Sequence, residues 1–532
     1  MIVALAVIAP ALSLGVSELL RVRTDVAGRI CLAGTTLGFT VAVGLVGLAL
    51  TQSGTGAPGG WLSLQSGRLP AAMLLLVLGV STLVQAYALR NLTGVPEQGR
   101  FIRTTTLTSS AVALTVTAAH LLLLLVGWEL TTLGLMAIVG QRYEQPLARE
   151  GLRRALRSLL IGDAALLLAG ALIWRSAGDA SLAHLHQVAI ALAHTQLPVL
   201  HLGLPAGPCV AVLLVIAASA RAAQLPGQSW LAATLTTPTP ASAMLHAGVV
   251  NAGGFLLVRL APVFADGPAG PALAIVIGLA TALYGGVLSL TRPDVKGGLA
   301  HSTSAQMGFM LIACGLGAYA AAILHLMGHG LYKATAFLSA EGAVATRIAK
   351  HAAPVLAPAA RSQFAAVLLS GIVCAGAMAA AMLSFAQGAL QDPGAIVPVA
   401  FAWAAAVTVS AALLRGSHLG RTSVLALGAL ACFAYAGLLA GLSAYLRFTV
   451  ATGMHPLPLA ATFPVIGAGF ATVFALTLPA AHVMQSLRLR LYPHLLDLGS
   501  VSVRPPARRL PFMRATGRAT HPARLSERSA TA

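Results

Sequence analysis

Long apolar windows separated by short polar segments recur along the whole chain. Windows of about 17–25 apolar residues can each cross the roughly 30 Å hydrocarbon core of a bilayer as a helix. The pattern predicts about fifteen spans, or 13–15 because the fourth and fifth nearly merge. The predicted spans cover residues 2–20, 28–50, 70–89, 103–119, 120–140, 157–175, 206–224, 240–262, 271–291, 298–317, 319–345, 362–385, 395–414, 422–446 and 461–484.

The basic residues alternate with these spans. Of the 33 lysines and arginines, 27 follow odd-numbered spans. Basic loops stay in the cytoplasm, so this bias predicts that the N-terminus lies outside and the C-terminus in the cytoplasm. The location expected from the resemblance given below is the inner (plasma) membrane of a bacterial cell. The topological bias also explains most of the net charge of +19. A nucleic-acid role is not expected.

Composition indicates an all-α polytopic membrane protein. The chain is 57% hydrophobic and 9% charged, with a mean hydropathy of +0.84, which is too apolar for a soluble protein of 532 residues. We expect a transmembrane domain over 1–484 and a basic cytoplasmic tail over 485–532, disordered after about residue 500. Single, scattered cysteines predict neither a disulfide framework nor a metal site. The first span is expected to be a retained helix, not a signal peptide.

The eleventh span carries three ionisable residues on one helical face. His325, His329 and Lys333 follow the spacing i, i+4, i+8. Ionisable groups are costly in hydrocarbon and mark proton or ion pathways. The two histidines could instead bind a metal by spacing alone, but no glutamate, cysteine or third histidine lies close in the sequence. The pattern favours a proton relay.

Other apolar segments also contain polar candidates. Glu129 and Asp163 lie in the fifth and sixth spans, and Glu341 ends the eleventh. Arg221 precedes Pro226, where we expect the seventh span to break. Arg221 could pair with Glu129, or could extend to the cytoplasmic surface. Glu129 could equally form a purely structural pair with a neighbouring helix.

His246 opens the eighth span. Histidine can pass a proton between its ring nitrogens at neutral pH. Asn251 and three nearby glycines allow close helix contacts around it. A structural core histidine is the alternative.

Five motifs, in order, resemble the antiporter-like subunits of respiratory complex I, the NuoL/MrpA-like superfamily. The first is Val-Gly-Trp-Glu at 126–129, which is similar to the family's Leu-Gly-Trp-Glu. The others are Ala-Gln-Leu-Pro…Trp-Leu at 223–231, Pro-Thr-Pro-x-Ser-Ala-x-x-His at 238–246, Asp-Val-Lys…Gln-x-Gly at 294–308, and His-x-x-x-His-x-x-x-Lys at 325–333. The resemblance implies a channel of about fourteen helices, with two broken helices and two inverted five-helix repeats.

The resemblance also implies roles for the residues. Glu129 and Asp163 match the family's helix-five and helix-six acids. His246, His325, His329 and Lys333 match its central relay. Arg221 replaces the usual helix-seven lysine, which implies an Arg221–Glu129 pair. The lysine of the second broken helix is missing from 362–390, and Glu341 stands where a small residue is usual.

One branch fits these departures better: the membrane subunit (DabB-type) of the two-component Dab inorganic-carbon pump. The resemblance implies a cation-conducting subunit beside a large cytoplasmic zinc-binding, carbonic-anhydrase-like partner (DabA-type). This chain would then be no enzyme and would hold no cofactor, with the zinc in the partner. A proton-pumping subunit of a respiratory NADH-quinone oxidoreductase, a membrane hydrogenase, a cation/proton antiporter and a membrane scaffold remain alternatives. The sequence does not distinguish H⁺ from Na⁺ as the conducted ion.

Overall fold

The fold was analysed in a computed structural model that describes residues 1–51, 60–178, 180–199, 202–340, 360–385, 395–416, 420–447, 467 and 492–499. The chain divides into two units, Met1–Val501 and Ser502–Ala532, and the second lies outside the described residues. The predicted boundary at residue 484 and the disorder after residue 500 therefore stay predictions.

Helices dominate the described residues. The α-helices are α1 (Ile2–Leu19), α2 (Thr24–Thr51), α3 (Arg68–Asn91), α4 (Gln98–Thr117), α5 (Leu121–Val139), α6 (Pro146–Ala177), α7 (Leu185–His194), α8 (Ala206–Arg221), α9 (Ser229–Ala232), α10 (Thr239–Ala247), α11 (Ala252–Arg259), α12 (Ala261–Phe264), α13 (Ala269–Thr291), α14 (Val295–Gly315), α15 (Tyr319–Leu338), α17 (Ala360–Phe385), α18 (Ile396–Gly416) and α19 (Arg421–Leu446). Three 3₁₀ turns are η1 (Gly140–Arg142), η2 (Ala233–Thr236) and η3 (Val249–Asn251). Residues 492–499 are also helical.

The membrane architecture predicted from the sequence is confirmed. Ten helices in the described part of the chain are long and apolar enough to cross a bilayer. Four further predicted spans correspond to α4, α8, α14 and α15, which are helical but shorter or more polar. Their lower hydropathy comes from the threonines of α4 and from the histidines and lysines of α14 and α15. The fifteenth span lies outside the described residues.

A short hairpin departs from the all-helical expectation. Strands β1 (Gln196–Val199) and β2 (Leu202–Pro205) pair antiparallel, with Gln196 opposite Pro205 and Val199 opposite Leu202. The hairpin and α7 lie in the connection between α6 and α8. This connection is too short and too polar to predict as a span, and the two strands do not change the helical fold class.

The predicted helix break after Arg221 is confirmed. Helix α8 ends at Arg221, and Ala223 has a φ of 51°, a left-handed conformation that cannot continue a right-handed helix. The segment Thr239–Arg259 is also interrupted, by η3. By contrast, α17 is continuous over 26 residues, because no proline interrupts 362–385. The second break implied by the resemblance does not occur within these residues.

The interrupted segment Thr239–Arg259 is the innermost part of the protein. Its most apolar window is 89% buried, against 28% for α13. Helix α11 packs against α8 and α14, where a Cβ on Gly253 would clash with the Ala218 carbonyl and one on Gly254 with Met310. These close approaches confirm that glycines allow tight helix contacts here. The result is a crowded polar centre surrounded by outer helices.

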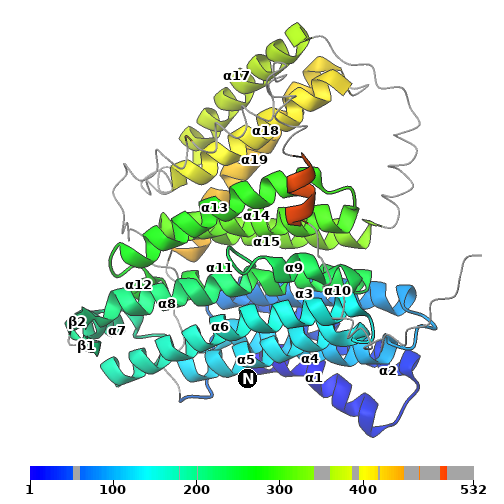
Figure 1. Cartoon of the computed structure of the whole chain (residues 1–532), viewed down its shortest axis with the longest axis vertical. Coiled ribbons are helices and arrows are strands. Elements are labelled where there is room, and N and C mark those ends of the chain that lie inside the picture. The colour runs from blue at the N-terminus through cyan, green and yellow to red at the C-terminus, as the bar shows by residue number, and fades with distance from the viewer. Residues whose placement is uncertain are drawn as a thin grey trace, which may run out of the picture. The chain divides into compact units, whose positions relative to one another are not determined.

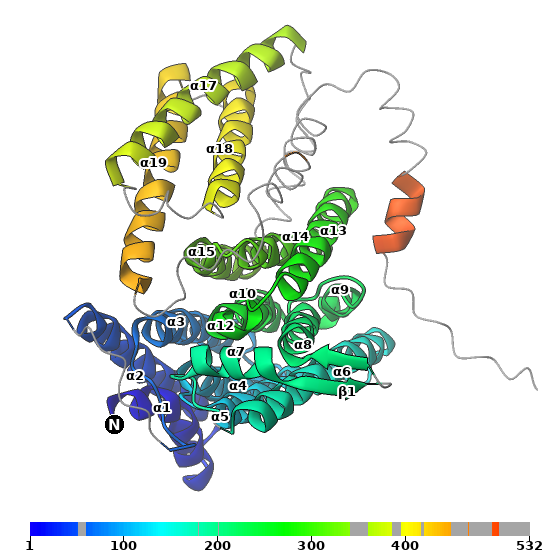
Figure 2. The same cartoon turned by 90° about the vertical axis from the view of Figure 1, so that its left-hand side faces the viewer.

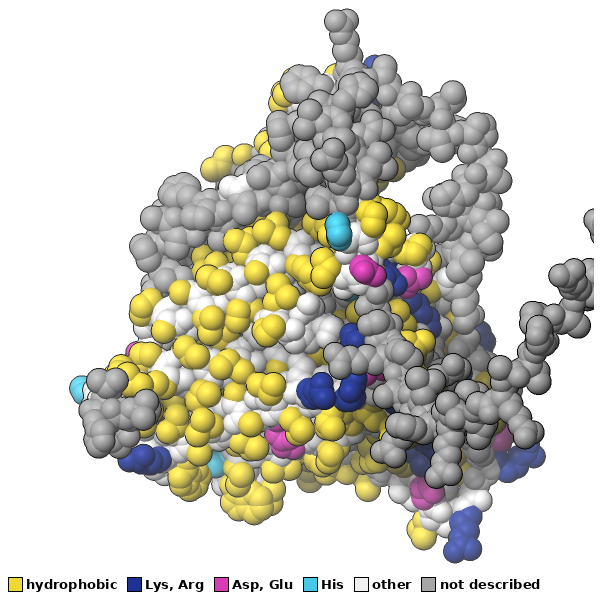
Figure 3. Space-filling view, in the orientation of Figure 1, with side chains coloured by type: hydrophobic (Ala, Val, Ile, Leu, Met, Phe, Trp, Pro, Cys, Tyr) yellow, Lys and Arg dark blue, Asp and Glu magenta, His cyan; other side chains and the backbone are white. Residues whose placement is uncertain are grey.

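Helices α17, α18 and α19 pack mainly on one another. Figures 1 and 2 both show them as a separate group, and α19 connects the group to α15 and α3. Their shared core contains Cys374, Met378, Val407 and Cys432. Figure 3 shows hydrophobic side chains over much of the middle of the face in view.

Most basic loops meet at one end of the helices. Arg103 at the start of α4 pairs with Glu18 at the end of α1 (2.8 Å), and Arg142 in η1 pairs with Glu97 before α4 (4.0 Å). Lys296 at the start of α14 donates to the Thr237 carbonyl (3.2 Å). We call these helix termini the basic end. They are joined by the loops 20–23, 92–97, 140–145, 222–238 and 292–294. In Figure 3 the visible basic side chains gather mainly towards one side.

Candidate functional site

A buried ion pair occupies the junction of α5, α6 and α8. Arg221 at the end of α8 contacts Asp163 of α6, with Nη2 and Oδ1 3.2 Å apart. Only 1% of the Arg221 side chain and 6% of the Asp163 side chain are exposed. A buried charge is tolerated only when it is paired and hydrogen-bonded, so each residue stabilises the other.

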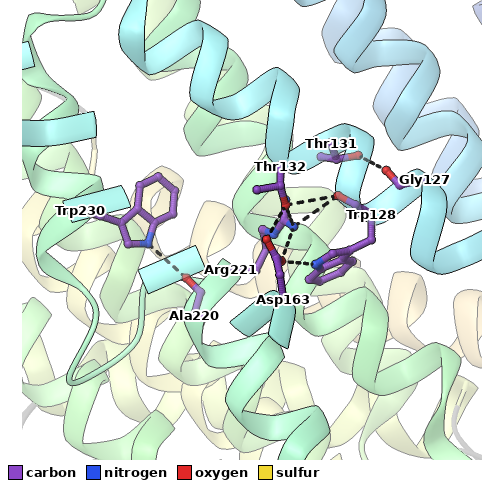
Figure 4. A network of polar contacts seen from close by, with 8 residues as sticks. All are labelled: Gly127, Trp128, Thr131, Thr132, Asp163, Ala220, Arg221 and Trp230. Carbon is purple, nitrogen blue, oxygen red and sulfur yellow. Dashed lines mark hydrogen bonds and ion pairs between the residues drawn. The ribbon is translucent and has the colours of Figure 1, made fainter. Parts of the chain in front are cut away.

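Helix α5 completes this pair (Figure 4). Trp128 Nε1 donates to Asp163 Oδ1 (2.8 Å), and Thr132 Oγ1 donates to Asp163 Oδ2 (3.0 Å). Arg221 also donates to Thr132, and its guanidinium carbon lies 4.2 Å from the centre of a Trp128 ring. The ring face attracts the cation. We call Trp128, Thr132, Asp163 and Arg221 the arginine site.

The expected Arg221–Glu129 ion pair is wrong, because the structure pairs Arg221 with Asp163. Glu129 lies close enough for the charges of both residues to interact with its carboxyl group. Its Oε1 atom is buried and has no hydrogen-bond partner among the described residues. Successive positions on α5 point in different directions, so Trp128 and Thr132 face Asp163 while Glu129 does not join the site. The alternative that Arg221 extends to the surface is excluded by its burial.

The predicted face of α15 carries a row of ionisable residues. His325 and His329 have ring centroids 6.1 Å apart and planes at 14°. His329 is 4% exposed, and its Nδ1 lies 3.1 Å from Oδ1 of Asn251. Asn251 in turn donates to the Ala247 carbonyl (2.7 Å). The Nε2 atoms of both histidines are buried without a partner in the described residues.

Lys333 ends this row. It is fully buried, and its Nζ donates to the Leu299 carbonyl of α14 (3.0 Å) and to Ser302. Lys333 is eight residues beyond His325, which corresponds to about 12 Å along the helix axis. The row therefore spans a substantial part of the membrane thickness.

His246 lies beside the row. Its Nδ1 is 3.2 Å from Thr303 Oγ1, and its ring stacks on Phe337 of α15 with centroids 4.4 Å apart. His246 is 2% exposed. The structure thus brings His246, Asn251, His329 and Lys333 together, and we call them, with His325, the central row.

An apolar cavity of about 30 Å³ adjoins both sites. Trp128 and Thr131 line it from α5, and Asn251 and Leu326 line it from the side of the central row. Valine, leucine and methionine side chains of α3 and α4 supply much of the remaining wall. One water needs about 10–15 Å³, so one or two could fit, but few polar groups face the space to hold them.

Two regions add nothing to the central row. Glu341 lies outside the described residues. The described helices α17–α19 contain no Asp, Glu, Lys, Arg or His within 362–385, 395–414 and 422–446. No group of three or more His, Cys, Asp or Glu side chains in the described part of the chain is placed to hold a metal ion.

Sequence reasoning missed the hydroxyl groups that bind these residues. Thr132, Ser302 and Thr303 each contact a charged or imidazole side chain. Ser302 and Thr303 lie in a motif singled out in the sequence, but serine and threonine are common on apolar helices and bond mostly to their own backbone. Only the partner across the helix contact distinguishes them.

Comparison with known proteins places this geometry in a family. The family model described as "NADH:quinone oxidoreductase/Mrp antiporter, TM" matches residues 118–385. That range includes the arginine site and the central row.

Three relatives illustrate the range of similar proteins. "Probable inorganic carbon transporter subunit DabB1" of Halothiobacillus neapolitanus is 37% identical over 291 residues, 55% of this chain and 51% of the relative. NADH-quinone oxidoreductase subunit L of Mycobacterium tuberculosis is 30% identical over 421 residues, 77% of this chain and 62% of the relative. A chain in the structure of the Mrp complex from Dietzia has a TM-score of 0.54 at 26% identity, over 93% of this chain and 55% of that chain. The chain therefore spans about half to two thirds of the length of these relatives.

Proposed function

Because the chain belongs to the NADH:quinone oxidoreductase/Mrp antiporter transmembrane family, we propose that it is the cation-conducting membrane subunit of an energy-coupled inorganic-carbon uptake complex. One observation carries the conducting role: the central row combines four buried polar side chains with the half-buried His325, and three of the five lie on one face of α15. Such groups in a membrane interior mark ion pathways. Similarity to probable inorganic carbon transporter subunits supports the substrate.

In this proposal protons move through the central row. Histidines accept and release protons at either ring nitrogen, and the buried amine of Lys333 can do the same. The free nitrogens of His325 and His329 leave room for a proton or a water at each step. Hard cations such as Na⁺ prefer oxygen ligands, whereas this row offers mainly nitrogen, which favours H⁺.

The acids and the arginine have supporting roles in this proposal. Arg221 keeps its proton and, held by Asp163, provides a fixed positive charge next to the row. Glu129, whose Oε1 has no hydrogen-bond partner in the described residues, is the carboxyl group free to change its charge. Its charge acts through space on the arginine site.

The chemistry is assigned to a partner. We propose a large cytoplasmic zinc-binding, carbonic-anhydrase-like subunit (DabA-type) that hydrates CO₂ to bicarbonate, and a cytoplasmic basic end for this chain. Each charge crossing 100 mV releases about 2.3 kcal/mol, enough to drive the hydration strongly in one direction. The chain itself would then be an ion conduit and not an enzyme.

The test is growth of a carbonic-anhydrase-deficient bacterium in ambient air. The chain is expressed alone, with the large gene beside it, and with that gene plus a protonophore. Rescue by the pair, lost with the protonophore and with Lys333→Met, is the expected result. Rescue by the pair carrying Lys333→Met at normal membrane levels would contradict the conducting role.

A second candidate is a proton-pumping subunit of a respiratory NADH-quinone oxidoreductase or a related complex. Its support is the 30% identity with subunit L over 77% of this chain. The same strains separate the two proposals. Failure of the assembled pair to rescue growth, together with co-purification of quinone-reducing subunits, would favour the respiratory reading.

A further inference from the structure

Lys333 and His246 reach two neighbouring hydroxyl residues of α14. Lys333 donates to Ser302, and the next residue, Thr303, lies 3.2 Å from His246 Nδ1. Thr303 is fully buried, so water does not compete for its hydroxyl. Both hydroxyls also donate to the Leu299 carbonyl of their own helix, from Ser302 at 3.0 Å and from Thr303 at 2.9 Å. A hydroxyl both donates and accepts a hydrogen bond, so one that rotates away from this carbonyl can receive a proton on one side and release one on the other.

A second pair of hydroxyls lies one helical turn from His246. Ser242 precedes His246 by four residues on α10 and therefore lies on the same helical face. Its Oγ is 2.9 Å from Oγ1 of Thr237, just before α10 begins. Ser242 is 2% exposed and Thr237 is 4% exposed.

The second pair reaches the basic end. Lys296 Nζ donates to the Thr237 carbonyl (3.2 Å) from the first turn of α14. Lys296 is half-buried, and the start of its helix is capped by Asp294, which accepts from Gly297 N (2.6 Å). Lys296 thus contacts the backbone of Thr237, whose own hydroxyl donates to the Thr234 carbonyl (2.7 Å).

The helices α17–α19 offer no equivalent. Ser370 of α17 is fully buried, but its hydroxyl has no hydrogen-bond partner in the described residues. Ser410 of α18 is also buried, and its hydroxyl lies near Gly428 in a cluster of apolar and cysteine side chains. A hydroxyl without an ionisable neighbour has no group with which to exchange a proton.

Building on the proposed function, we infer that Thr237, Ser242, Ser302 and Thr303, the hydroxyl network, carry protons between the central row and the basic end, with Lys296 at the outer limit. The proton leaves the row along the start of α14. The path bypasses α17–α19, which in this chain lack the family's second lysine.

The test compares substitutions that remove each hydroxyl with substitutions that keep it. Thr237→Val, Ser242→Ala, Ser302→Ala and Thr303→Val remove it, whereas Thr237→Ser, Ser242→Thr, Ser302→Thr and Thr303→Ser keep it. Ser370→Ala is the matched control, a buried serine outside the network. Proton flux is measured with a pH-sensitive dye in vesicles containing the complex.

We expect each hydroxyl-removing variant to lower proton flux about tenfold, the effect of losing one buried hydrogen bond from the path. The hydroxyl-keeping variants and Ser370→Ala should conduct like the unmodified complex. Normal flux in the hydroxyl-removing variants, or equal loss in the hydroxyl-keeping ones, would overturn the inference. The Lys333→Met complex separates this inference from the proposed function. If that complex does not conduct protons, the proposed function stands whatever the hydroxyl variants show. If it conducts normally, the proposed function itself is overturned.

Lys296 provides a second test that does not disturb the core. Lys296→Cys should lower flux, and an amine-bearing methanethiosulfonate reagent should restore it when added from the basic end. Four of the five native cysteines are buried, and the unmodified complex treated in the same way controls for Cys209. Restoration from the opposite side alone, or normal flux in untreated Lys296→Cys, would overturn the assignment of the outer limit.

Discussion

Two groups of helices in this chain differ in what their buried polar positions contain. In α5–α15, buried positions hold an arginine, a lysine, histidines and an aspartate, and Arg221, His246, His329 and Lys333 each bond to a residue of another element. In α17–α19, the described buried polar positions are serines, beside cysteines and methionine. Charge in a membrane interior requires polar partners on neighbouring helices, and the first group supplies them whereas the described membrane segments of α17–α19 contain no charged side chain.

This difference predicts where mutations hurt most. In the first group, a side chain removed from a charged pair leaves an unpaired charge. In the second group, a substitution that deletes a buried hydroxyl takes away a polar group that was costly to bury, so the protein should lose little stability.

Asp163→Asn should be the most damaging change. It leaves the Arg221 charge buried without its counter-ion, and breaking a buried pair in this way costs about 3–5 kcal/mol. The yield and the Tm of the purified complex should both fall sharply. The double variant Asp163→Asn/Arg221→Gln should recover most of the loss; no recovery would mean that Asp163 stabilises the protein through contacts other than the ion pair.

Gly253→Leu should come next. A side chain here meets the Ala218 carbonyl of α8, so α11 must move away from its neighbour. Overpacking of this kind costs about 1–3 kcal/mol. The Tm of the purified protein measures the effect. Gly44→Leu, on α2 with open space around its position, is the control and should leave the Tm unchanged.

Trp128→Phe should have a smaller effect. It keeps a ring beside Arg221 but removes the N–H that donates to Asp163 at 2.8 Å. One buried hydrogen bond to a charged group contributes about 1.5–3 kcal/mol, and part of this loss is offset because Thr132 and Arg221 still bind Asp163. Trp230→Phe, which removes a hydrogen bond to the Ala220 carbonyl, is the neutral-acceptor control and should cost less in Tm.

Ser370→Ala should change stability least. Its hydroxyl has no hydrogen-bond partner in the described residues, so its removal should be neutral or raise the Tm slightly. A clear loss of Tm would show that a polar group meets Ser370, and the contrast between the two groups of helices would then need revision.

The sequence was sufficient to predict the central row but not the arginine site. The period of an α-helix alone puts His325, His329 and Lys333 on one face, and the structure agrees. The partner of Arg221 depends instead on how α5 and α6 are rotated about their axes. The sequence analysis paired Arg221 with Glu129, and because α5 is apolar on nearly all sides its sequence gives little indication of its rotation. The contacts of Asp163 with Trp128 and Thr132 decide the pairing.

The same limit applies to the hydroxyl network and the hairpin. Serines and threonines bond to their own helix by default, so Thr303 and Ser302 could not be told apart from Thr105 or Ser109 in α4 by sequence. The helix break after Arg221, in contrast, was predictable from Pro226 because proline removes a donor. Local chemistry thus predicts breaks, whereas cross-helix partners require the three-dimensional packing.

In the proposed conducting subunit, the small apolar cavity beside Trp128 and Asn251 has a consequence for leakage of current. A cell stores energy as a voltage across its membrane, and a continuous file of water through a conducting subunit would dissipate that voltage. The hydrocarbon lining of this cavity offers few groups that could hold such a file. A conducting subunit with this lining would therefore leak little current between transport events.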